Sequence, residues 1–408
     1  MDFLENGTVL SPKGFRGAST AAGIRYKDRE DMALLVSDQP AAVAGTFTSN
    51  RVKAAPVLWD REIVNTTGSA QAVVVNAGIA NACTGKEGYD LCAKTADAVE
   101  KALQIPFEMT LVASTGVIGM LPPADRLEAG VRAMAESLSG AEEAGHKAAR
   151  AIMTTDTKPK EAAVSFEIGG KTVTLGGMCK GVGMIHPDMC TMLCFLTTDL
   201  AISRELLQEA LSEDVKETYN MISVDGDTST NDTCLLLANG EAKNPEITEK
   251  NEDYQRFVEA LHKINTCFAR KMAGDGEGAT ALLEVEVQGA KTHEDAKTLA
   301  RSVVSSSLVK AMIYGHDPNW GRILCALGYA GVEFDPYKVE LIYKSKAGEV
   351  LVVRNGVDAG YSEELAVKIL SEPEVTVVCR LSEGEESATA WGCDLTYDYV
   401  KINADYRS

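Results

Sequence analysis

Four short segments of the chain place glycines beside polar side chains where an apolar run ends, and such loops often carry binding or catalytic groups. The first is Ser114-Thr115-Gly116-Val117-Ile118-Gly119. Backbone N–H groups at a glycine turn, next to a hydroxyl, can stabilise the negative oxygen of a tetrahedral intermediate. A plain strand-to-loop turn would have the same composition. The segment alone therefore leaves both interpretations open.

A second segment, Lys180 to Leu193, has a lysine close to two glycines, which invites a phosphate-binding interpretation. A phosphate-binding loop places its lysine after the second glycine and before Ser or Thr, and that order is absent here. The dinucleotide pattern G-x-G-x-x-G is also incomplete. His186 has no second histidine or carboxylate at metal-ligand spacing, so we expect a hydrogen-bonded structural role for it and no metal.

Two further segments are rich in acidic residues. Asp225 to Thr233 looks like a calcium loop, but position 6 is Thr230 rather than Gly and position 12 is Leu236 rather than Glu. Turn formation is the better interpretation of that segment. Gly274 to Thr280 has three glycines around two acids just before an apolar run. Those acids could bind an ammonium group, although simple solvation is the commoner outcome.

The elements that must position these segments alternate between strands and helices. The mixture indicates a layered α/β or α+β fold. The helix-rich stretch from Ala124 to Lys160 is expected to join two lobes. Hydrophobic spacing predicts strands over 72–75, 111–113 and 281–287, a hairpin over 163–175, hairpin-like pairs around 339–353 and 375–399, and helices over 91–103, 203–211 and 294–312.

Composition excludes several functional classes. The chain has 408 residues, and 59 acidic against 40 basic side chains give a formal charge of −19. We therefore expect no nucleic acid and no membrane as partners, because both surfaces are anionic. Ten cysteines without a C-x-x-C pair predict mostly buried, reduced thiols. No signal-like start and no apolar run of ~18 residues are present, so we expect a cytoplasmic protein.

Taken together and in this order, the segments resemble the ornithine acetyltransferase family of arginine biosynthesis, the bifunctional glutamate N-acetyltransferase type. The resemblance runs from Gly14-Phe15 to Ser408, nearly the whole chain. One such motif would be weak support, whereas nine in register are strong. They are Thr46 to Val57, Asn81 to Gly85, Ser114 to Gly119, Thr154 to Thr157, Lys180 to Thr191, Val224 to Gly240, Gly274 to Thr280, Asp317 to Arg322 and Ile402 to Ser408.

The resemblance implies a chain that cuts itself immediately before a threonine, which then serves as an N-terminal nucleophile. The matching residue is Thr191, so the scissile bond is Cys190–Thr191. The products are an α chain of residues 1–190 and a β chain of residues 191–408. The implied fold is a two-lobed, self-processing α/β assembly, which is also found in self-cleaving aminopeptidases.

The same resemblance assigns roles to further residues. Thr115 and Gly116 form the oxyanion hole. Around the cleavage point, the usual Ser, Asn and Ala of the family are replaced by Val182, Asp188 and Cys190. The nucleophile itself is unchanged. The implied substrate contacts are Thr154 or Thr155, Lys180, Thr191, Glu277, Asn403 and Ser408.

This chemistry is physically reasonable for the residues present. A threonine hydroxyl needs an adjacent base, and after cleavage Thr191 would have an α-amine with an ordinary pKa of about 7.7 to 8.0. N-acetylornithine would acylate its Oγ, ornithine would leave, and glutamate would take the acetyl group in a ping-pong cycle. Lys180 would meet the α-carboxylate that both substrates share, and Glu277 would face the ornithine ammonium.

The resemblance also implies the partners of the chain. Its two fragments are expected to stay together as an α2β2 heterotetramer. No cofactor is implied, with acetyl-CoA as an alternative acetyl donor that would make the enzyme bifunctional. Two other functions stay open. A self-cleaving aminopeptidase would use water in place of glutamate, and a non-catalytic amino-acid sensor would bind ligand without turnover.

Overall fold

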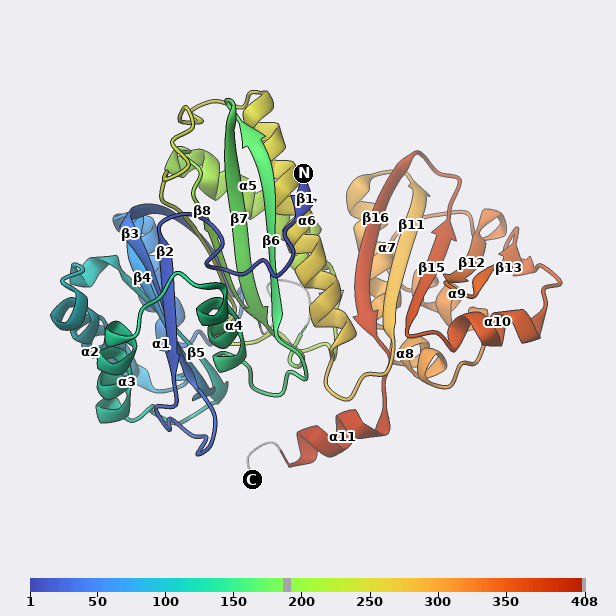
Figure 1. Ribbon diagram of the computed structural model, residues 1–408. Helices are drawn as coiled ribbons and strands as arrows, with labels where there is room; N and C mark the ends of the chain where they lie inside the picture. The colour runs from blue at the N-terminus through green and yellow to red at the C-terminus, as the bar shows by residue number, and fades with distance from the viewer. Residues whose placement is uncertain (186–191, 406–408) are drawn as a thin grey trace. The chain divides into compact units, whose positions relative to one another are not determined.

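Runs of β-branched and small apolar residues form the strands of two sheets in the computed structural model of the chain (Figure 1). The structure describes residues 1–185 and 192–405. The chain divides into two compact units. The first unit contains Met1–Gly181, the described residues 192–216 and Thr228–Phe268, and the second contains residues 182–185, Glu217–Asp227 and the described residues from Ala269 onward.

Nine strands of the described residues form the sheet of the first unit. Their order is β1-β6-β7-β8-β10-β3-β4-β5, and β2 pairs with β3. The β4–β5 and β8–β10 pairs are parallel, and the other neighbours are antiparallel. The strands are β1 (Asp2–Phe3), β2 (Phe15–Thr20), β3 (Met32–Phe47), β4 (Ser69–Ile79), β5 (Thr110–Val117), β6 (Lys160–Ile168), β7 (Lys171–Lys180), β8 (Leu193–Thr198) and β10 (Thr233–Ala238).

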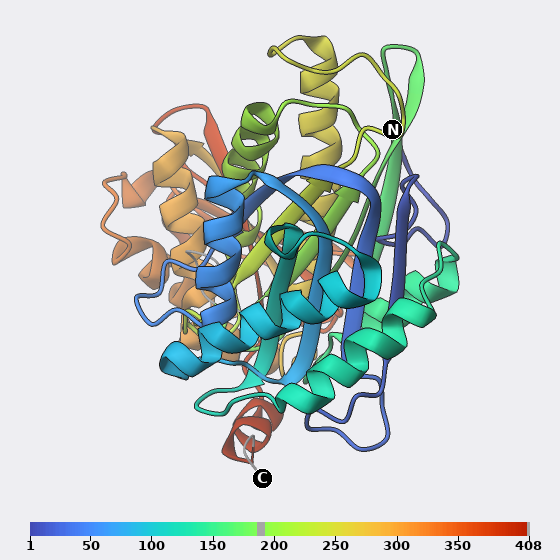
Figure 2. The same ribbon diagram turned by 90° about the vertical axis from the view of Figure 1, so that its left-hand side faces the viewer.

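Both faces of this sheet are apolar, because successive side chains of a strand point to opposite sides. In β4, Val73 and Val75 join one buried cluster, and Ala72 and Val74 join another. Helices α2 and α3 cover the second face (Figure 2). The helices that begin in this unit are α1 (Ala55–Thr66), α2 (Gly85–Leu103), α3 (Ala124–Glu136), α4 (Glu142–Ala151), α5 (Arg204–Glu217) and α6 (Glu252–Gly274).

The sheet of the second unit has seven strands within the described residues, in the order β14-β13-β12-β15-β11-β16-β9. One face is apolar: Leu283, Val285 and Val287 of β11 are fully buried. Helix α7 packs against β11 and β16 on that side (Figure 1). The elements are β9 (Ile222–Ser223), β11 (Leu282–Ala290), β12 (Glu340–Ser345), β13 (Gly348–Arg354), β14 (Val357–Asp358), β15 (Glu374–Arg380) and β16 (Glu386–Cys393), with α7 (His293–Ser305), α8 (Ser307–Tyr314), α9 (Trp320–Gly328), α10 (Glu363–Leu370) and α11 (Tyr397–Ala404).

The expected layered α/β fold with two lobes is confirmed. The hairpins predicted over 163–175 and 339–353 are β6–β7 and β12–β13. The helix predicted over 294–312 is two helices, because Ser306 ends α7 and its side chain accepts the N–H of Val309 to begin α8.

Three other expectations need correction. The segments around 375–399 do not form a hairpin, since β15 and β16 flank β11 on opposite sides. The stretch from 124 to 160 does not join two lobes; it contains α3 and α4, which belong to the first unit. The strand predicted over 111–113 continues as β5 through Ser114, Thr115 and Gly116 to Val117. In each case a local pattern fixed the element type but not its partner or its end.

The cysteines of the described residues are free thiols and most of them are buried, as expected. Among the helices that the structure describes, none is long and apolar enough to cross a membrane.

Candidate active site

The predicted oxyanion residues occupy the end of β5, an edge strand of the first sheet. Thr115 and Gly116 pair in register with Ala77 and Gly78 of β4. Gly116 has φ +129°, and a Cβ at this position would overlap the backbone carbonyl of Gly78. Only glycine fits such a close approach of two backbones. The extended strand end therefore depends on glycine at this position.

Asn231, which precedes β10, fixes the same strand end from a distant part of the sequence. Its Nδ2 donates to the carbonyl of Ser114 in β5 and to that of Ala80, the residue after β4, each at 2.7 Å. Its side chain is buried, so these hydrogen bonds are shielded from competing water. Asn231 thus holds the backbone immediately before Thr115.

Lys180, the last residue of β7, reaches this strand end. Its Nζ lies 3.4 Å from the hydroxyl of Thr115 and 3.9 Å from Oδ2 of Asp156. The Lys180 side chain is 4% exposed and that of Asp156 is fully buried. Lys160 contacts the other oxygen of Asp156 at 2.8 Å. Thr115, Gly116, Asp156, Lys160 and Lys180 are called the Lys180 cluster below.

Asp156 is the anion that compensates these two buried ammonium groups. Burial alone would raise its pKa, but Lys180, Lys160 and the N–H of Gly181 outweigh burial and lower the pKa to about 2. Asp156 also accepts the backbone N–H of Thr154 at 3.2 Å. Lys180 thus places a buried ammonium group at this strand end, and an ammonium group suits a carboxylate-bearing ligand.

The second unit holds two other predicted residues, Glu277 and Asn403. Nδ2 of Asn403, on α11, donates to Oε2 of Glu277 at 2.8 Å. The N–H of Glu277 donates to the carbonyl of Val182 at 2.8 Å. A Cβ on Gly183 would meet the Glu277 carboxylate at 2.5 Å, so any larger residue here would displace that carboxylate.

Asp225 completes this second group of residues. It accepts the hydroxyl of Tyr399, on α11, at 3.2 Å, and burial together with Asp225 and Glu277 raises the pKa of that hydroxyl. Asp225, Glu277, Tyr399 and Asn403 are called the Glu277 cluster below. Helix α11 itself has no buried residue.

The structure therefore brings the predicted residues together in two groups. Thr115, Gly116 and Lys180 are in contact in the first unit, and Thr154 joins them through Asp156. Thr155 follows Thr154 in the same turn region and is half-buried. Glu277 and Asn403 are in contact in the second unit. Thr191, Cys190, Ser408 and His186 lie outside the described residues.

Four residues of these clusters were given no role by the sequence: Asp156, Lys160, Asp225 and Tyr399. Asp156 stands in the quoted segment Thr154 to Thr157, and its spacing of four from Lys160 was a usable signal for an ion pair. Asp225 was interpreted as a turn residue. Nothing in the sequence around Tyr399 pointed to a distant carboxylate.

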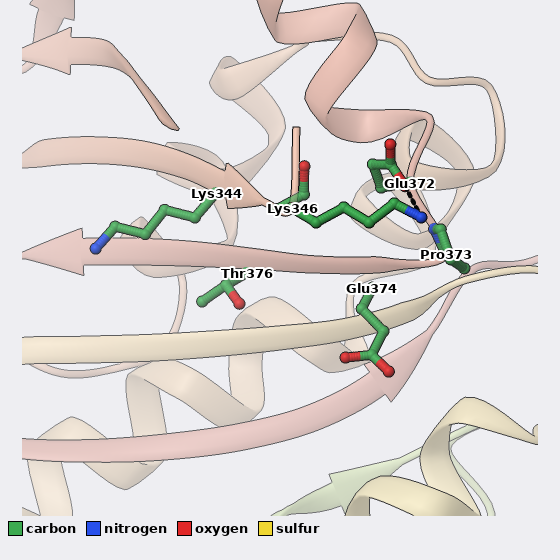
Figure 3. Close-up of a pocket in the computed structure, with 7 residues that line it drawn as sticks. Lys344, Lys346, Glu372, Pro373, Glu374 and Thr376 are labelled. Atoms are coloured by element: carbon green, nitrogen blue, oxygen red, sulfur yellow. Dashed lines mark ion pairs between the residues drawn. The ribbon is translucent and has the colours of Figure 1, made fainter. Parts of the chain in front are cut away.

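A separate pocket of about 570 Å³ lies on the sheet of the second unit and is shown in Figure 3. Lys346 reaches across it to Glu372, with Nζ 2.9 Å from the carboxylate. Two other lining residues pair with residues outside the pocket: Glu374 with Arg270 at 3.0 Å and Lys344 with Glu349 at 3.6 Å. None of the predicted site residues lines the pocket among the residues described. We assign it no function.

No group of three or more His, Cys, Asp or Glu side chains able to hold a metal occurs in the part of the chain that the structure describes.

Comparison with known proteins places this site in a family. Residues 16–408 match the ArgJ family. The chain is 51% identical over 410 residues to the arginine biosynthesis bifunctional protein ArgJ of Symbiobacterium thermophilum, with 100% of both chains covered. It is 48% identical to the protein of that name from Caldanaerobacter subterraneus, again over 100% of both.

A solved structure agrees with these matches. The crystal structure of the arginine biosynthesis bifunctional protein ArgJ from Bacillus halodurans is 44% identical, with a TM-score of 0.50. It covers 52% of this chain and 97% of the solved chain. Fold, site and relatives together define an acyltransferase of amino-acid biosynthesis. More closely, the chain belongs to the ArgJ family, the acetyltransferases of arginine biosynthesis.

Proposed function

We propose that this enzyme moves an acetyl group from N2-acetylornithine to glutamate through an acetyl ester on Thr191, giving ornithine and N-acetylglutamate. The observation that carries the proposal is the contact between Lys180 and Thr115 at the end of β5. It places a buried cation of the Lys180 cluster beside the strand end that the resemblance assigns to the oxyanion hole. Family membership supports the same reaction.

The reaction has two half-reactions. The Thr191 hydroxyl attacks the acetyl carbonyl, the C–N bond to ornithine breaks, and the hydroxyl proton passes through the Thr191 α-amine to the leaving nitrogen. The amine of glutamate then attacks the ester, and Oγ recovers a proton as N-acetylglutamate leaves. Thr115 and Gly116 stabilise the oxyanion in both steps, a contribution that typically reaches about 2.7–4 kcal/mol per donor.

Charge decides how the two substrates are recognised. Lys180 binds the α-carboxylate that N-acetylornithine and glutamate share. Glu277 binds the ammonium of the ornithine side chain, and Asn403 orients Glu277 through the 2.8 Å hydrogen bond. Thr154 or Thr155 and Ser408 provide further polar contacts to substrate.

Self-cleavage between Cys190 and Thr191 provides the α-amine that this mechanism requires. The solved Bacillus halodurans chain supports it, because 97% of that chain matches only 52% of this one. A β chain of residues 191–408 would make up a similar share of the full chain. Two copies of each product chain would form an α2β2 enzyme in the cytoplasm. It needs no cofactor, and acetyl-CoA serves as a second acetyl donor.

The test is to incubate the purified enzyme with N-acetylornithine and glutamate, with and without acetyl-CoA, and to measure ornithine and N-acetylglutamate. A denaturing gel should show two chains, the larger beginning at Thr191. Thr191→Ala should stay a single chain and be inactive; its efficient cleavage would contradict the assignment. Release of acetate without acetylated glutamate would indicate an amidase instead. Binding without turnover by an intact chain would indicate a sensor.

A further inference from the structure

The acidic segment that failed as a calcium loop lies between β9 and β10, and its aspartates contact the chain on either side of the proposed cleavage point. We call residues Val224 to Asp232 the 224–232 loop. Asp225, near its start, accepts two successive backbone N–H groups: Oδ2 accepts that of Met184 at 2.6 Å, and Oδ1 accepts that of Ile185 at 2.8 Å. Both carboxylate oxygens are therefore engaged.

The loop backbone reinforces this contact within the second unit. The N–H groups of Val224 and Asp225 both donate to the carbonyl of Ile185, at 2.8 and 3.3 Å. Met184 has φ +54°, the left-handed region that a side chain disfavours. Such a conformation persists only where surrounding contacts over-determine it. The main chain at 184–185 is thus held in a strained shape by the start of the 224–232 loop.

Asp232, at the end of the same loop, makes the corresponding contact within the first unit. Its Oδ1 accepts the N–H of Met192 at 3.1 Å, and the next residue, Thr233, donates its N–H to the Met192 carbonyl at 3.1 Å. Met192 directly follows Thr191 in the sequence. Both polar backbone groups of the residue after the proposed nucleophile are therefore held by consecutive residues.

Asp232 differs chemically from Asp225. It is fully buried, and its Oδ2 has no hydrogen-bond partner within the described residues. Burial raises its pKa well above the usual range, although the Met192 N–H, the hydroxyls of Thr48 and Ser229, and the Lys180 ammonium oppose that rise. A neutral acid still accepts an amide hydrogen bond. It also avoids placing a buried negative charge one residue from Thr191.

We propose that Asp225 and Asp232 are positioning residues for self-cleavage, fixing the backbone before and after the segment that contains Cys190 and Thr191. The inference rests on the proposed cleavage. In that step, Thr191 Oγ attacks the Cys190 carbonyl carbon, the C–N bond breaks, and the α-nitrogen takes the hydroxyl proton. Water then hydrolyses the ester, leaving a Cys190 carboxylate and a free Thr191 hydroxyl. Misplacing reacting atoms by about 1 Å can cost ~100-fold in rate.

The experiment follows the disappearance of full-length precursor after cell-free synthesis, on denaturing gels, with N-terminal sequencing of the product. Asp225→Asn should slow cleavage at least tenfold. The asparagine side chain accepts hydrogen bonds only through its oxygen, so its NH2 group would face one of the two backbone N–H groups that Asp225 now accepts. The matched control is Asp227→Asn. It makes the same charge change in the same loop at an exposed side chain, and it should cleave like the wild type.

Asp232 provides a second, opposite test. Asp232→Asn copies a neutral acid and should cleave within about threefold of the wild type, whereas Asp232→Ala removes the acceptor for Met192 and should be slowed tenfold or more. Each variant is compared at a temperature where its near-ultraviolet circular dichroism matches that of the wild type. If Asp225→Asn does not fold, Tyr399→Phe, which removes one bond to Asp225, should still slow cleavage a few-fold.

The outcomes separate this inference from the function on which it rests. A wild-type chain that is never cut at residue 191 would overturn both. A wild-type chain that cleaves while Asp225→Asn cleaves equally fast would overturn only the positioning roles. Equal slowing by Asp227→Asn would show that loop charge, not contact geometry, matters. Equal slowing by Asp232→Asn and Asp232→Ala would remove the neutral-acid role of Asp232.

Discussion

The Lys180 cluster and the Glu277 cluster are built on different kinds of scaffold. The first lies at the ends of strands in a nine-stranded sheet, and its ionised groups are almost entirely buried. The second joins a glycine-rich loop to α11, a terminal helix without a buried residue. Chemistry and folding stability should therefore be coupled in the first cluster and separable in the second.

The largest effect is expected from removing the Asp156 carboxylate of the Lys180 cluster. Asp156→Asn leaves Lys180 and Lys160 buried against a neutral amide, and breaking a buried ion pair costs about 3–5 kcal/mol. The free energy of unfolding, measured with urea, should fall by that amount. Lys86→Ala, which breaks an exposed pair with Asp90, is the control and should change it by less than about 1 kcal/mol.

Thr115→Ala tests the catalytic contribution of the same cluster. Losing one oxyanion donor typically lowers turnover by about a hundredfold to a thousandfold. Substrate binding should change little, so kcat falls while KM stays near the wild-type value. Steady-state kinetics with N-acetylornithine checks this. A raised KM with an unchanged kcat would move Thr115 from the reacting centre to the binding contacts.

Glu277→Gln tests the second cluster. A hydrogen bond to a charged group contributes about 1.5–3 kcal/mol, so KM for N-acetylornithine should rise roughly ten- to a hundredfold. The free energy of unfolding should stay within about 1 kcal/mol of the wild type, unlike that of Asp156→Asn. A large loss of stability here would erase the distinction between the two clusters. Equal, small kinetic losses in Glu277→Gln and Thr115→Ala would show that the site is wrongly placed.

The last effect is confined to the pH dependence of stability and concerns Asp60 on α1, which accepts the N–H of Val112 in β5 at 2.8 Å. Burial raises the pKa of Asp60 well above its usual range, with the Val112 bond opposing. The folded state then binds the proton more tightly than the unfolded state. The contribution of this carboxyl group to the free energy of unfolding is fully present at acidic pH. It declines as pH rises past the ordinary aspartate pKa, by up to about 1.4 kcal/mol per pH unit.

Asp60→Asn should remove that decline and leave the activity unchanged. The measurement is the free energy of unfolding in urea between pH 4 and 7 for both proteins. Asp156 contributes in the opposite sense, because its pKa is lowered to about 2 and its stabilisation is lost only as pH falls through the range between about 4 and 2. Parallel curves for wild type and Asp60→Asn would refute the buried-proton interpretation.

Local patterns predicted much of the fold and part of the site. The alternation of Val164, Phe166 and Ile168 around a Gly-Gly turn was enough to predict β6–β7, because register in a hairpin is set by the turn. The segment 375–399 looked equally like a hairpin, but its strands β15 and β16 are separated by β11. Two strands that are close in the sequence are easily predicted to pair with each other. Their closeness does not reveal a third strand that lies between them and pairs with both.

Two of the site residues that sequence reasoning missed share one physical property. Asn231 and Asp225 act through groups 40 to 151 residues away in the chain, so no spacing rule relates them to these partners. Lys160 was unexpected for another reason. Lysine is rarely buried, and only the pairing with Asp156 makes its position in the core tolerable. Such residues become visible once the sheet order is known.

The order of strands in the first sheet has a consequence for how the two product chains would stay associated. Strands β8 and β10 come after the proposed cut, yet they lie between β7 and β3, which come before it. Strands of the two chains would therefore alternate within one sheet. Separating them would break the ladders on both sides of β8–β10 and open the core. Neither polypeptide made alone would then possess the complete first sheet, and recovery of activity from separately produced halves would require their folding together.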